Sequence, residues 1–297
     1  MVFLAFALFL LSFLLVFSFA PSEAFSDRKG VSMAKISSSQ LQKSIHVSLE
    51  ELASLIDQAQ FSDEIQSYLD TIAKFHHYSI YNQLLIHDAF PMASHVAGFC
   101  TWRGQFNRTV KKGEKGIPIL APVKVRVESQ GDEDEPDHRL FFKVVYVFDI
   151  SQTEGDEVPA LDVWKSPEYR PELQKVLINY AESLGLSVGV QEIGEAQGAL
   201  TSDHQIFLNA TAGTKTLVHE IAHYLARHLE SSSDHKQREL EAEAVAYVVC
   251  RHFGFEELKS PNYLYLTGLN AEDLKASLTT ISGLAGEIIR YINNFKV

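Results

Sequence analysis

The chain has 297 residues, of which 46% are hydrophobic, and this length suits one large or two small globular domains. Its formal net charge of −12 excludes a general electrostatic attraction to nucleic acids or anionic membranes, so a nucleic-acid site would have to be a local basic patch. The two cysteines, Cys100 and Cys250, have the spacing of neither a metal site nor a disulfide framework, which favours a reducing compartment.

The N-terminus conflicts with that interpretation. Val2 to Ala20 is almost purely apolar and long enough for a signal-peptide core or a membrane span. No Lys or Arg precedes this run, and Met33 opens an ordinary soluble type of sequence. Two alternatives remain: residues 1–32 are a signal or anchor segment, or they are mistranslated upstream sequence. A true start at Met33 predicts a cytoplasmic protein, and the other alternative predicts a membrane-anchored or exported one.

Hydrophobic periodicity predicts the elements that follow. Apolar residues at helical spacing predict a helix from Ser48 to about Phe75, and Ser48 with Glu51 forms a capping-box pattern. A second, short helix is predicted over Ser79–Asp88, and the acidic stretch Glu128–His138 is predicted to be a hairpin loop. Runs rich in Val, Ile and Phe predict strands over Val96–Phe99, Ile117–Val127 and Leu140–Phe148.

A local basic segment lies between Thr101 and Arg126 and contains seven basic residues and one acidic residue, Glu114. Trp102 lies among these cations, and aromatic rings beside cations suit single-stranded nucleic acid, whose bases stack and whose phosphates need neutralising. The alternative is a solvated basic hairpin that balances the acidic loop. The seven basic residues are Arg103, Arg108, Lys111, Lys112, Lys115, Lys124 and Arg126.

Residues 153–171 are acidic and contain three prolines, which predicts a linker. The expected fold class is α+β, with an N-terminal α+β domain over residues 48–152 and a mainly helical domain with a small sheet over residues 172–297. The second domain is predicted to contain helices near Glu172–Leu184, Thr214–His228, Arg238–Phe253 and Ala271–Phe295, and strands near Leu186–Gln191 and Gln205–Asn209.

The second of these helices, Thr214–His228, contains the motif H-E-x-x-H, in which His219 and His223 are four residues apart and therefore lie on one face. Two imidazoles so placed can bind one ion, and catalytic zinc takes nitrogen and carboxylate ligands and keeps one position for water. Glu220 can then act as the general base that deprotonates this water. The alternatives are two merely exposed histidines, or a metal that only holds the fold.

The next helix supplies carboxylates for a third ligand. Glu239 and Glu243 are four residues apart and share a face, so one can bind the metal while the other orients a ligating histidine. Glu241 lies about 160° from that face and is expected to be solvated. His228 and His235 flank the helices, and we expect them to be solvated or to cap helix ends.

Two sets of motifs resemble a known family. Residues 77–86, 96–102, 110–122 and 148–155 resemble the N-terminal domain of ArdC-type antirestriction proteins. The H-E-x-x-H helix, followed by Glu239 and Glu243, resembles both the ArdC C-terminal domain and the ImmA/IrrE metallopeptidases. Together the resemblance covers about Leu49 to Tyr265.

This resemblance implies an N-terminal domain that binds single-stranded DNA, a zincin-like C-terminal domain with Zn²⁺, and a role in protecting mobile DNA from host restriction. Because gluzincin-type sites use the first of two acids four apart, the resemblance favours Glu239 over Glu243 as the metal ligand. It also implies five DNA-facing candidates, which are Trp102, Arg103, Lys111, Lys112 and Lys115.

The sequence therefore predicts a zinc metallopeptidase that is tethered to single-stranded DNA and acts on a protein or peptide of unknown identity. One alternative is a non-catalytic antirestriction protein that binds single strands and has a structural metal. Another is a secreted or anchored zinc peptidase without a nucleic-acid role. The motif is the same in all three, so the sequence does not choose among them.

Overall fold

The computed structural model describes residues 36–55, 58–127, 137–158, 170–231, 234–256, 258 and 269–295. The predictions for residues 1–32, for most of the loop at 128–138 and for the middle of the linker at 153–171 lie outside these residues. Within the described part of the chain, no helix combines the length and the apolar character that a membrane span requires.

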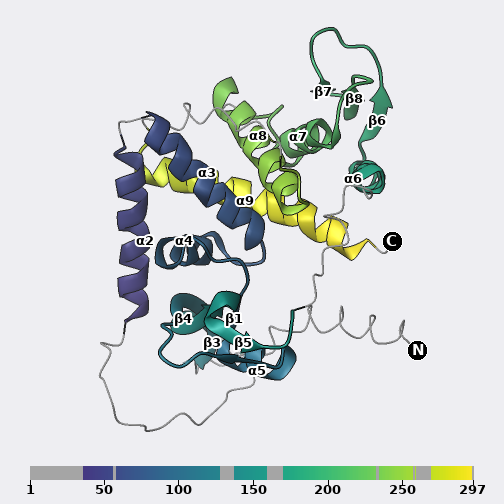
Figure 1. Ribbon diagram of the computed structural model, residues 1–297. Coiled ribbons are helices and arrows are strands. Elements are labelled where there is room, and N and C mark those ends of the chain that lie inside the picture. The colour runs from purple at the N-terminus through teal and green to yellow at the C-terminus, as the bar shows by residue number, and fades with distance from the viewer. Residues whose placement is uncertain are drawn as a thin grey trace, which may run out of the picture. The chain divides into compact units, whose positions relative to one another are not determined.

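The N-terminal helices are α2 (Ser38–Ala53), α3 (Gln58–Lys74) and α4 (Ile80–Ala89) (Figure 1). The prediction of a single helix from Ser48 to Phe75 is therefore wrong. Two helices occupy this region, and the first of them begins ten residues earlier, at Ser38. Ser37 caps α2 in a capping box with Gln40. Ser48 lies inside the helix, and its hydroxyl donates 2.7 Å to Asp88 Oδ2. The capping pattern occurs at both serines, and the apolar residues between them extend the buried face of α2 to the earlier one.

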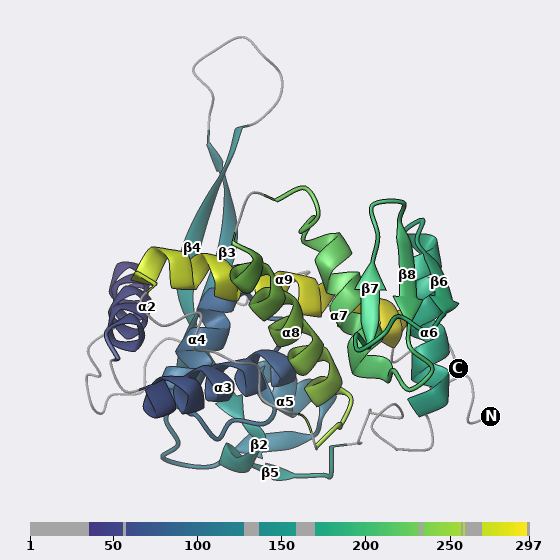
Figure 2. The same ribbon diagram turned by 90° about the horizontal axis from the view of Figure 1, so that it is seen from above.

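The first sheet positions a hairpin. Its antiparallel strands β1 (Val96–Gly98), β4 (Asp137–Asp149) and β3 (Ile117–Val127) are hydrogen-bonded in the order β1-β4-β3. Helix α5 (Phe99–Gln105) follows β1, and the 3₁₀ helix η1 (Ile150–Gln152) follows β4. A two-stranded sheet pairs β2 (Arg108–Val110) with β5 (Thr153–Gly155). In Figure 2 the β3–β4 hairpin extends away from the helices.

The described residues of the second half form a small mixed sheet and four helices. The strands β6 (Ser187–Val190), β8 (Gln205–Leu208) and β7 (Gly198–Leu200) have the order β6-β8-β7, with β6 parallel and β7 antiparallel to β8. The prediction did not include β7, which has only three residues and no run of β-branched side chains. The helices are α6 (Arg170–Ser183), α7 (Thr214–Leu225), α8 (His235–His252) and α9 (Ala271–Asn294).

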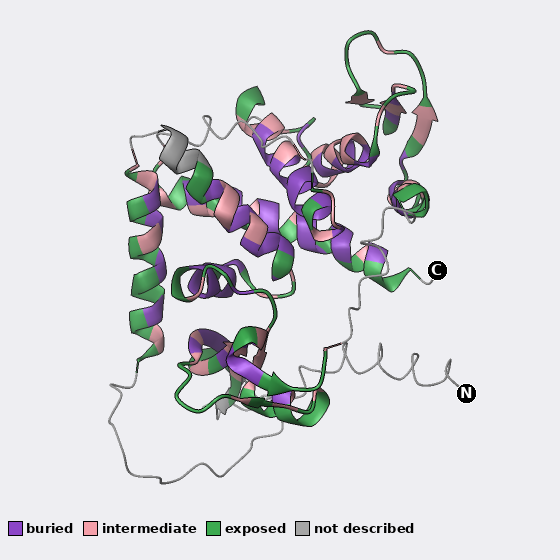
Figure 3. Ribbon diagram, viewed as in Figure 1, coloured by how far each residue is buried: buried purple, intermediate pink, exposed green. Residues whose placement is uncertain are grey.

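One large apolar core holds most of these helices together. Helix α8 contacts α3, α7 and α9, and Figure 3 shows buried residues along α8 and α9. The core includes Leu49 and Leu69 from before the predicted linker and Val248 and Ile288 from after it, each at most 1% exposed. The α+β class is confirmed. Residues 36–297 form one compact unit, and the division into domains at 48–152 and 172–297 stays a prediction.

A pair of histidines lies where the turn before α4 meets the end of α8. The ring of His76 packs edge-on against the ring of His252 at a centroid distance of 4.6 Å, and His252 Nδ1 lies 2.8 Å from the carbonyl oxygen of Ala73. Burial, with smaller effects from the charges of His252, His77 and Arg290, lowers the pKa of His76 to about 3. This histidine is therefore neutral in the folded protein at pH values where it is charged in the unfolded chain.

This difference predicts acid sensitivity. Because the folded-state pKa of His76 is depressed, its contribution to stability is complete above the unfolded value of about 6.5 and is lost as the pH falls towards about 3. Urea unfolding of the full chain between pH 7 and pH 4 should show a decrease of at most about 1.4 kcal/mol per pH unit from this residue. His76→Phe should make the decrease less steep, whereas His46→Gln, at a half-exposed histidine, should not. An unchanged slope in His76→Phe would contradict the assignment.

Candidate metal centre

Helix α7 separates an apolar face from a face with two histidines. Leu217, Val218 and Ile221 are fully buried and anchor the helix in the core. The side chains of His219 and His223 are 18% and 13% exposed, and their Nε2 atoms lie 3.0 Å apart. A spacing of four residues, just over one helical turn, brings the two rings together because 3.6 residues complete a turn.

Helix α8 brings one carboxylate between these two nitrogens. Glu239 Oε2 lies 3.4 Å from His219 Nε2, and Glu239 Oε1 lies 3.3 Å from His223 Nε2. Among the described residues, His219, His223 and Glu239 are the group of ligand-type side chains close enough together to hold a metal ion. Both histidines lower the pKa of Glu239 through hydrogen bonds, so its carboxylate is ionised at neutral pH.

The spacing of these atoms fits a tetrahedral metal. Ligands about 2.1 Å from a tetrahedral zinc lie about 3.4 Å from one another. The two Nε2 atoms lie 3.0 Å apart, each has an oxygen of Glu239 within 3.4 Å, and one ligand atom from each of the three residues lies within 4.8 Å of the others. The donor set of two imidazoles and one carboxylate is also the kind that catalytic zinc uses. The residues present therefore fit a zinc ion with one position left for water.

Glu243, the other carboxylate of this face of α8, contacts the first histidine from behind. Its Oε2 lies 3.4 Å from His219 Nδ1, and its Oε1 forms an ion pair with Lys215. Burial would lower the pKa of His219, but hydrogen bonds with Glu239 and Glu243 outweigh burial and raise it to about 9. The two carboxylates that the sequence left as alternatives thus have different positions, with Glu239 beside the two Nε2 atoms and Glu243 on the far nitrogen of His219.

Glu220 lies against the edge strand β7. Its side chain is buried, and the backbone amide of Leu200 donates a hydrogen bond to its carboxylate. Burial and the charge of Glu239 raise the pKa of Glu220, and His219 and the Leu200 amide offset only part of that increase. Gly198 makes this arrangement possible, because a Cβ atom there would lie 2.7 Å from Glu220 Oε1.

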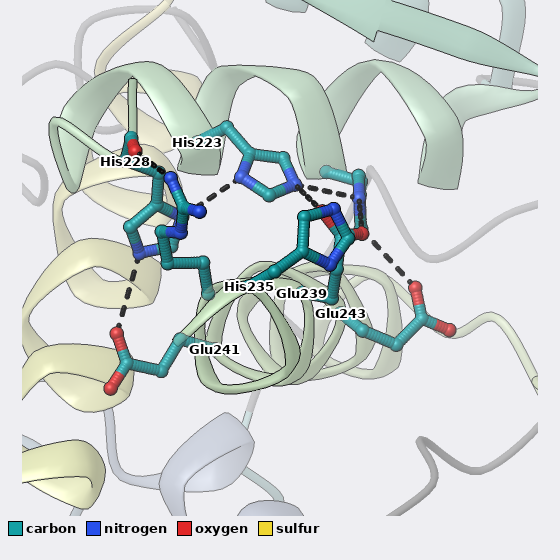
Figure 4. A network of polar contacts seen from close by, with 8 residues as sticks. His223, His228, His235, Glu239, Glu241 and Glu243 are labelled. Atoms are coloured by element: carbon teal, nitrogen blue, oxygen red, sulfur yellow. Dashed lines mark hydrogen bonds and ion pairs between the residues drawn. The ribbon is translucent and has the colours of Figure 1, made fainter. Parts of the chain in front are cut away.

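Two residues that the sequence analysis placed at the surface or at a helix end are buried here. Glu241 is 8% exposed, so the expectation that it is solvated is wrong. His228 is 4% exposed and not solvated, but it lies at the end of α7, where its amide donates to the His223 carbonyl, in agreement with the alternative that it caps a helix end. His228 Nδ1 lies 2.9 Å from His223 Nδ1, and His228 Nε2 lies 3.4 Å from Glu241 Oε2. Figure 4 shows His223 between His228 on one side and Glu239 on the other. His235, in contrast, is 76% exposed, as expected, and lies 3.7 Å from Glu239 Oε1.

The basic candidates of the N-terminal half lie mostly on a rigid turn between β2 and β3. Lys111, Lys112 and Lys115 are exposed there, and Gly113 supplies the positive φ of 94° that the turn needs. Gln152 of η1 fixes the turn from below, because its carbonyl accepts from the Lys111 amide and its side-chain amide donates 2.9 Å to the Lys115 carbonyl. Arg103 is exposed on α5, which contacts β2.

Trp102 does not share this exposure. It is 1% exposed, and its Nε1 donates 2.8 Å to the Phe148 carbonyl. The prediction that Trp102 stacks on a base is therefore wrong, because both faces of its ring are covered. Tyr146 is 45% exposed and lies beside the turn. A Cβ atom added at Gly116 would lie only 2.9 Å from the Cβ atom of Tyr146. Tyr146 lies in a nearly continuous apolar run, Leu140–Phe148, so the sequence pattern did not indicate that it is exposed.

Parts of the chain are similar to known proteins. Residues 38–148 match the profile of the N-terminal domain of the anti-restriction factor ArdC. The chain is also 25% identical over 272 residues to an uncharacterised protein of Bacillus anthracis, a match that covers 75% of this chain and 46% of the relative. The chain thus spans less than half the length of that curated relative.

Two solved structures are similar to the chain. Both are crystal structures of the antirestriction protein ArdC from plasmid R388, one metal-free and one with Mn(II) bound. Their TM-scores are 0.47 and 0.43 and their identities 18% and 19%; each match covers 74% of this chain, and 87% and 86% of the respective structure.

The protein is thus an α+β protein with a candidate metal centre on two neighbouring helices. Residues 38–148 resemble the N-terminal domain of the anti-restriction factor ArdC, and this match covers about a third of the chain. The matched residues end at 148, before the helices that form the candidate metal centre. The roles of those helices are therefore argued from their own geometry.

The contact between β7 and Glu220 predicts that adding one methyl group at Gly198 lowers the stability of the protein. In Gly198→Ala, the new Cβ would lie 2.7 Å from both Glu220 Oε1 and Thr216 Cγ2, and the β-branched threonine cannot easily move away. We expect a loss of about 1–3 kcal/mol in the free energy of unfolding, as for other overpacked sites. Gly189→Ala in β6 is the matched control, because its nearest neighbour would be at an ordinary 3.8 Å. Equal stability of the two variants would contradict the close approach.

Proposed function

We propose that the protein is a zinc-dependent metallopeptidase of the antirestriction type, whose residues 172–297 form an ImmA/IrrE-like catalytic domain and whose N-terminal domain binds single-stranded DNA. The observation that carries the enzymatic part is the approach of His219, His223 and Glu239, whose ligand atoms lie within 4.8 Å of one another. The presence of a buried carboxylate, Glu220, next to the first histidine distinguishes this arrangement from a simple cluster of polar side chains.

The residues have separate roles in this proposal. His219, His223 and Glu239 would hold the zinc ion, while Glu243, which contacts His219 Nδ1, would orient that histidine. When bound, zinc lowers the pKa of a water molecule towards about 7 and polarises a peptide carbonyl. Glu220 accepts the proton of that water at its carboxylate and can pass it to the leaving amine nitrogen. Its raised pKa supports this role, because a carboxyl group shifted towards neutral pH can both take up and release a proton.

Zinc analysis and a hydrolysis assay test the enzymatic part. The full chain should contain about one zinc per molecule and His223→Ala much less, while His46→Ala, at an exposed histidine, should keep the metal. Glu220→Gln should also keep zinc, because Glu220 is not a ligand, but should lose about 10²–10⁴-fold of its cleavage rate on a fluorogenic peptide library. Cleavage by Glu220→Gln at the wild-type rate would exclude Glu220 as the base, and absence of zinc from the wild-type protein would exclude the metal centre.

The DNA-binding part of the proposal rests on the turn Lys111–Lys115. This turn presents exposed cations on a backbone that Gln152 and Asp149 hold in place, in a chain with a net charge of −12. Asp149 is 1% exposed and accepts hydrogen bonds from three backbone amides, including Ser94 at 2.7 Å and Ser151 at 2.9 Å. Phosphates would contact the lysines, and Tyr146 would take the stacking role that Trp102 cannot.

Titration of the full chain with fluorescent oligo(dT) at several salt concentrations tests this surface. Lys112→Ala/Lys115→Ala should weaken binding and reduce the slope of log K against log salt by about 0.7 per lost phosphate contact. Tyr146→Ala should weaken binding by about 1–3 kcal/mol with little change in the salt slope, because a stacked base carries no charge. Lys43→Ala on α2 is the control for a surface cation elsewhere. Identical salt slopes in the double variant and the wild type would place DNA on another surface.

The non-catalytic alternative makes the opposite prediction for one variant. If the metal only holds the fold and protection depends on binding single strands, Glu220→Gln will protect DNA against restriction as well as the wild type does, and the lysine variants will not. Two observations support this alternative: the hydrogen-bonded lysine turn and the match of residues 38–148 to the ArdC N-terminal domain.

A further inference from the structure

We propose that His228 is a positioning residue of the metal centre: with Glu241 it fixes the tautomer and the orientation of His223, so that His223 Nε2 carries a lone pair towards the metal position. This inference rests on the proposed metal centre and adds a histidine that neither ligates nor reacts. The basis is a continuous chain of polar contacts that runs from the ligand atoms into the apolar core (Figure 4).

The direction of the hydrogen bonds follows from the end of this chain. Glu241 Oε1 accepts from Ser277 Oγ and from Gln237 Nε2, each at 3.1 Å. Glu241 Oε2 faces His228 Nε2, and because a carboxylate only accepts, that nitrogen must carry the proton.

The proton on His228 Nε2 determines the next contact. In the proposed arrangement, His228 is the neutral tautomer with its proton on Nε2, in which Nδ1 is an acceptor. His223 Nδ1 lies 2.9 Å away and must therefore donate, which leaves His223 Nε2 without a proton. This is the nitrogen that lies 3.0 Å from His219 Nε2 and 3.3 Å from Glu239 Oε1.

The backbone at the end of α7 places His228 over His223. Arg227 has a left-handed φ of 52°, its amide donates to the Tyr224 carbonyl, and the His228 amide donates 3.0 Å to the His223 carbonyl. These two bonds define a Schellman motif, in which the residue after the left-handed position packs on the residue five positions earlier. An apolar pair is usual at that contact, and here two histidines form it. Arg238 also donates 2.6 Å to the His228 carbonyl, so the backbone of His228 is held independently of its ring.

A purely space-filling role for His228 makes a different prediction from a positioning role. The ring is 4% exposed, so an apolar side chain of similar size would satisfy packing. Only a side chain that accepts from His223 and donates to Glu241 would satisfy the polar chain. Glutamine has an acceptor oxygen and a donor nitrogen at its end and can do both, whereas leucine can do neither.

Zinc affinities of the full-length variants, measured by competition with a chromophoric chelator, test the proposal. His228→Leu should bind zinc about 10–100-fold more weakly than the wild type, as is typical when a partner of a ligating histidine is lost. His228→Gln should recover most of that loss. His87→Gln, at another histidine that is 4% exposed but hydrogen-bonds to Thr71, is the matched control and should bind zinc as the wild type does. An affinity of His228→Leu equal to or above that of His228→Gln would overturn the proposal.

A second measurement needs no metal. Nitrogen-15 NMR of the metal-free full chain, labelled at its histidines, reports which ring nitrogen of His223 carries the proton. The wild type and His228→Gln should show the proton on Nδ1, and His228→Leu should lose this preference. If His223 keeps the proton on Nδ1 in His228→Leu, His228 does not set the tautomer and the inference is wrong. If the wild type binds no zinc, the proposed enzymatic function fails, and this NMR comparison still decides the role of His228.

Discussion

The approach of His219, His223 and Glu239, whose ligand atoms lie within 4.8 Å of one another, is the constraint on which the second half of the structure depends. Three polar side chains do not remain so close unless the two helices that carry them are fixed by other contacts. The fully buried residues of α7, Leu217, Val218 and Ile221, supply the apolar part of that fixation. On α8, Glu239 and Glu243 face α7 while Leu240 and Val248 lie in the core.

A buried acid fixes the backbone in the N-terminal half of the chain. Asp149 is removed from solvent, but the backbone amides of Ser94, His95 and Ser151 satisfy its oxygens and fix the end of β4. Gln152 follows directly and holds the lysine turn by its main chain and side chain together. Hydrogen bonds to a carboxylate lower the pKa of Asp149 although burial alone would raise it, so the buried charge is stable. The exposed cations therefore stand on a backbone that needs little ordering when a ligand binds.

Much of this arrangement follows from short-range patterns in the sequence. The four-residue spacing of His219 and His223, and of Glu239 and Glu243, requires only that both segments are helices, and strong apolar periodicity predicts those helices. The preference for Glu239 over Glu243 came from a family resemblance and agrees with the positions of the two side chains, although their roles stay predictions. The strands β3 and β4 were predicted nearly to their ends because runs of Val, Ile and Phe continue through them.

The patterns failed where burial depends on contacts between distant segments. Trp102 was expected to be exposed because cations surround it in the sequence, yet Phe148, 46 residues later, accepts its indole proton. Glu241 was expected to be solvated because it points away from Glu239, and that direction leads instead to Ser277 of α9. The position of His228 depends on local backbone, because a left-handed residue at the end of α7 places position 228 over position 223. The sequence does not predict this conformation, because arginine rarely adopts a positive φ.

These failures have a common physical origin, because a buried polar group is stable only when its partners come from other elements. His228 and Glu241 are such groups, and their partners come from α7, α8 and α9 together. Removing one member would leave the others unsatisfied in a low-dielectric interior, so the chain specifies how the three helices pack. The same contacts determine which nitrogen His223 offers at the candidate metal centre. Packing of α9 against α8 and the chemistry of a histidine on α7 are therefore parts of one hydrogen-bonded system, although Ser277 and His223 are 54 residues apart in the sequence.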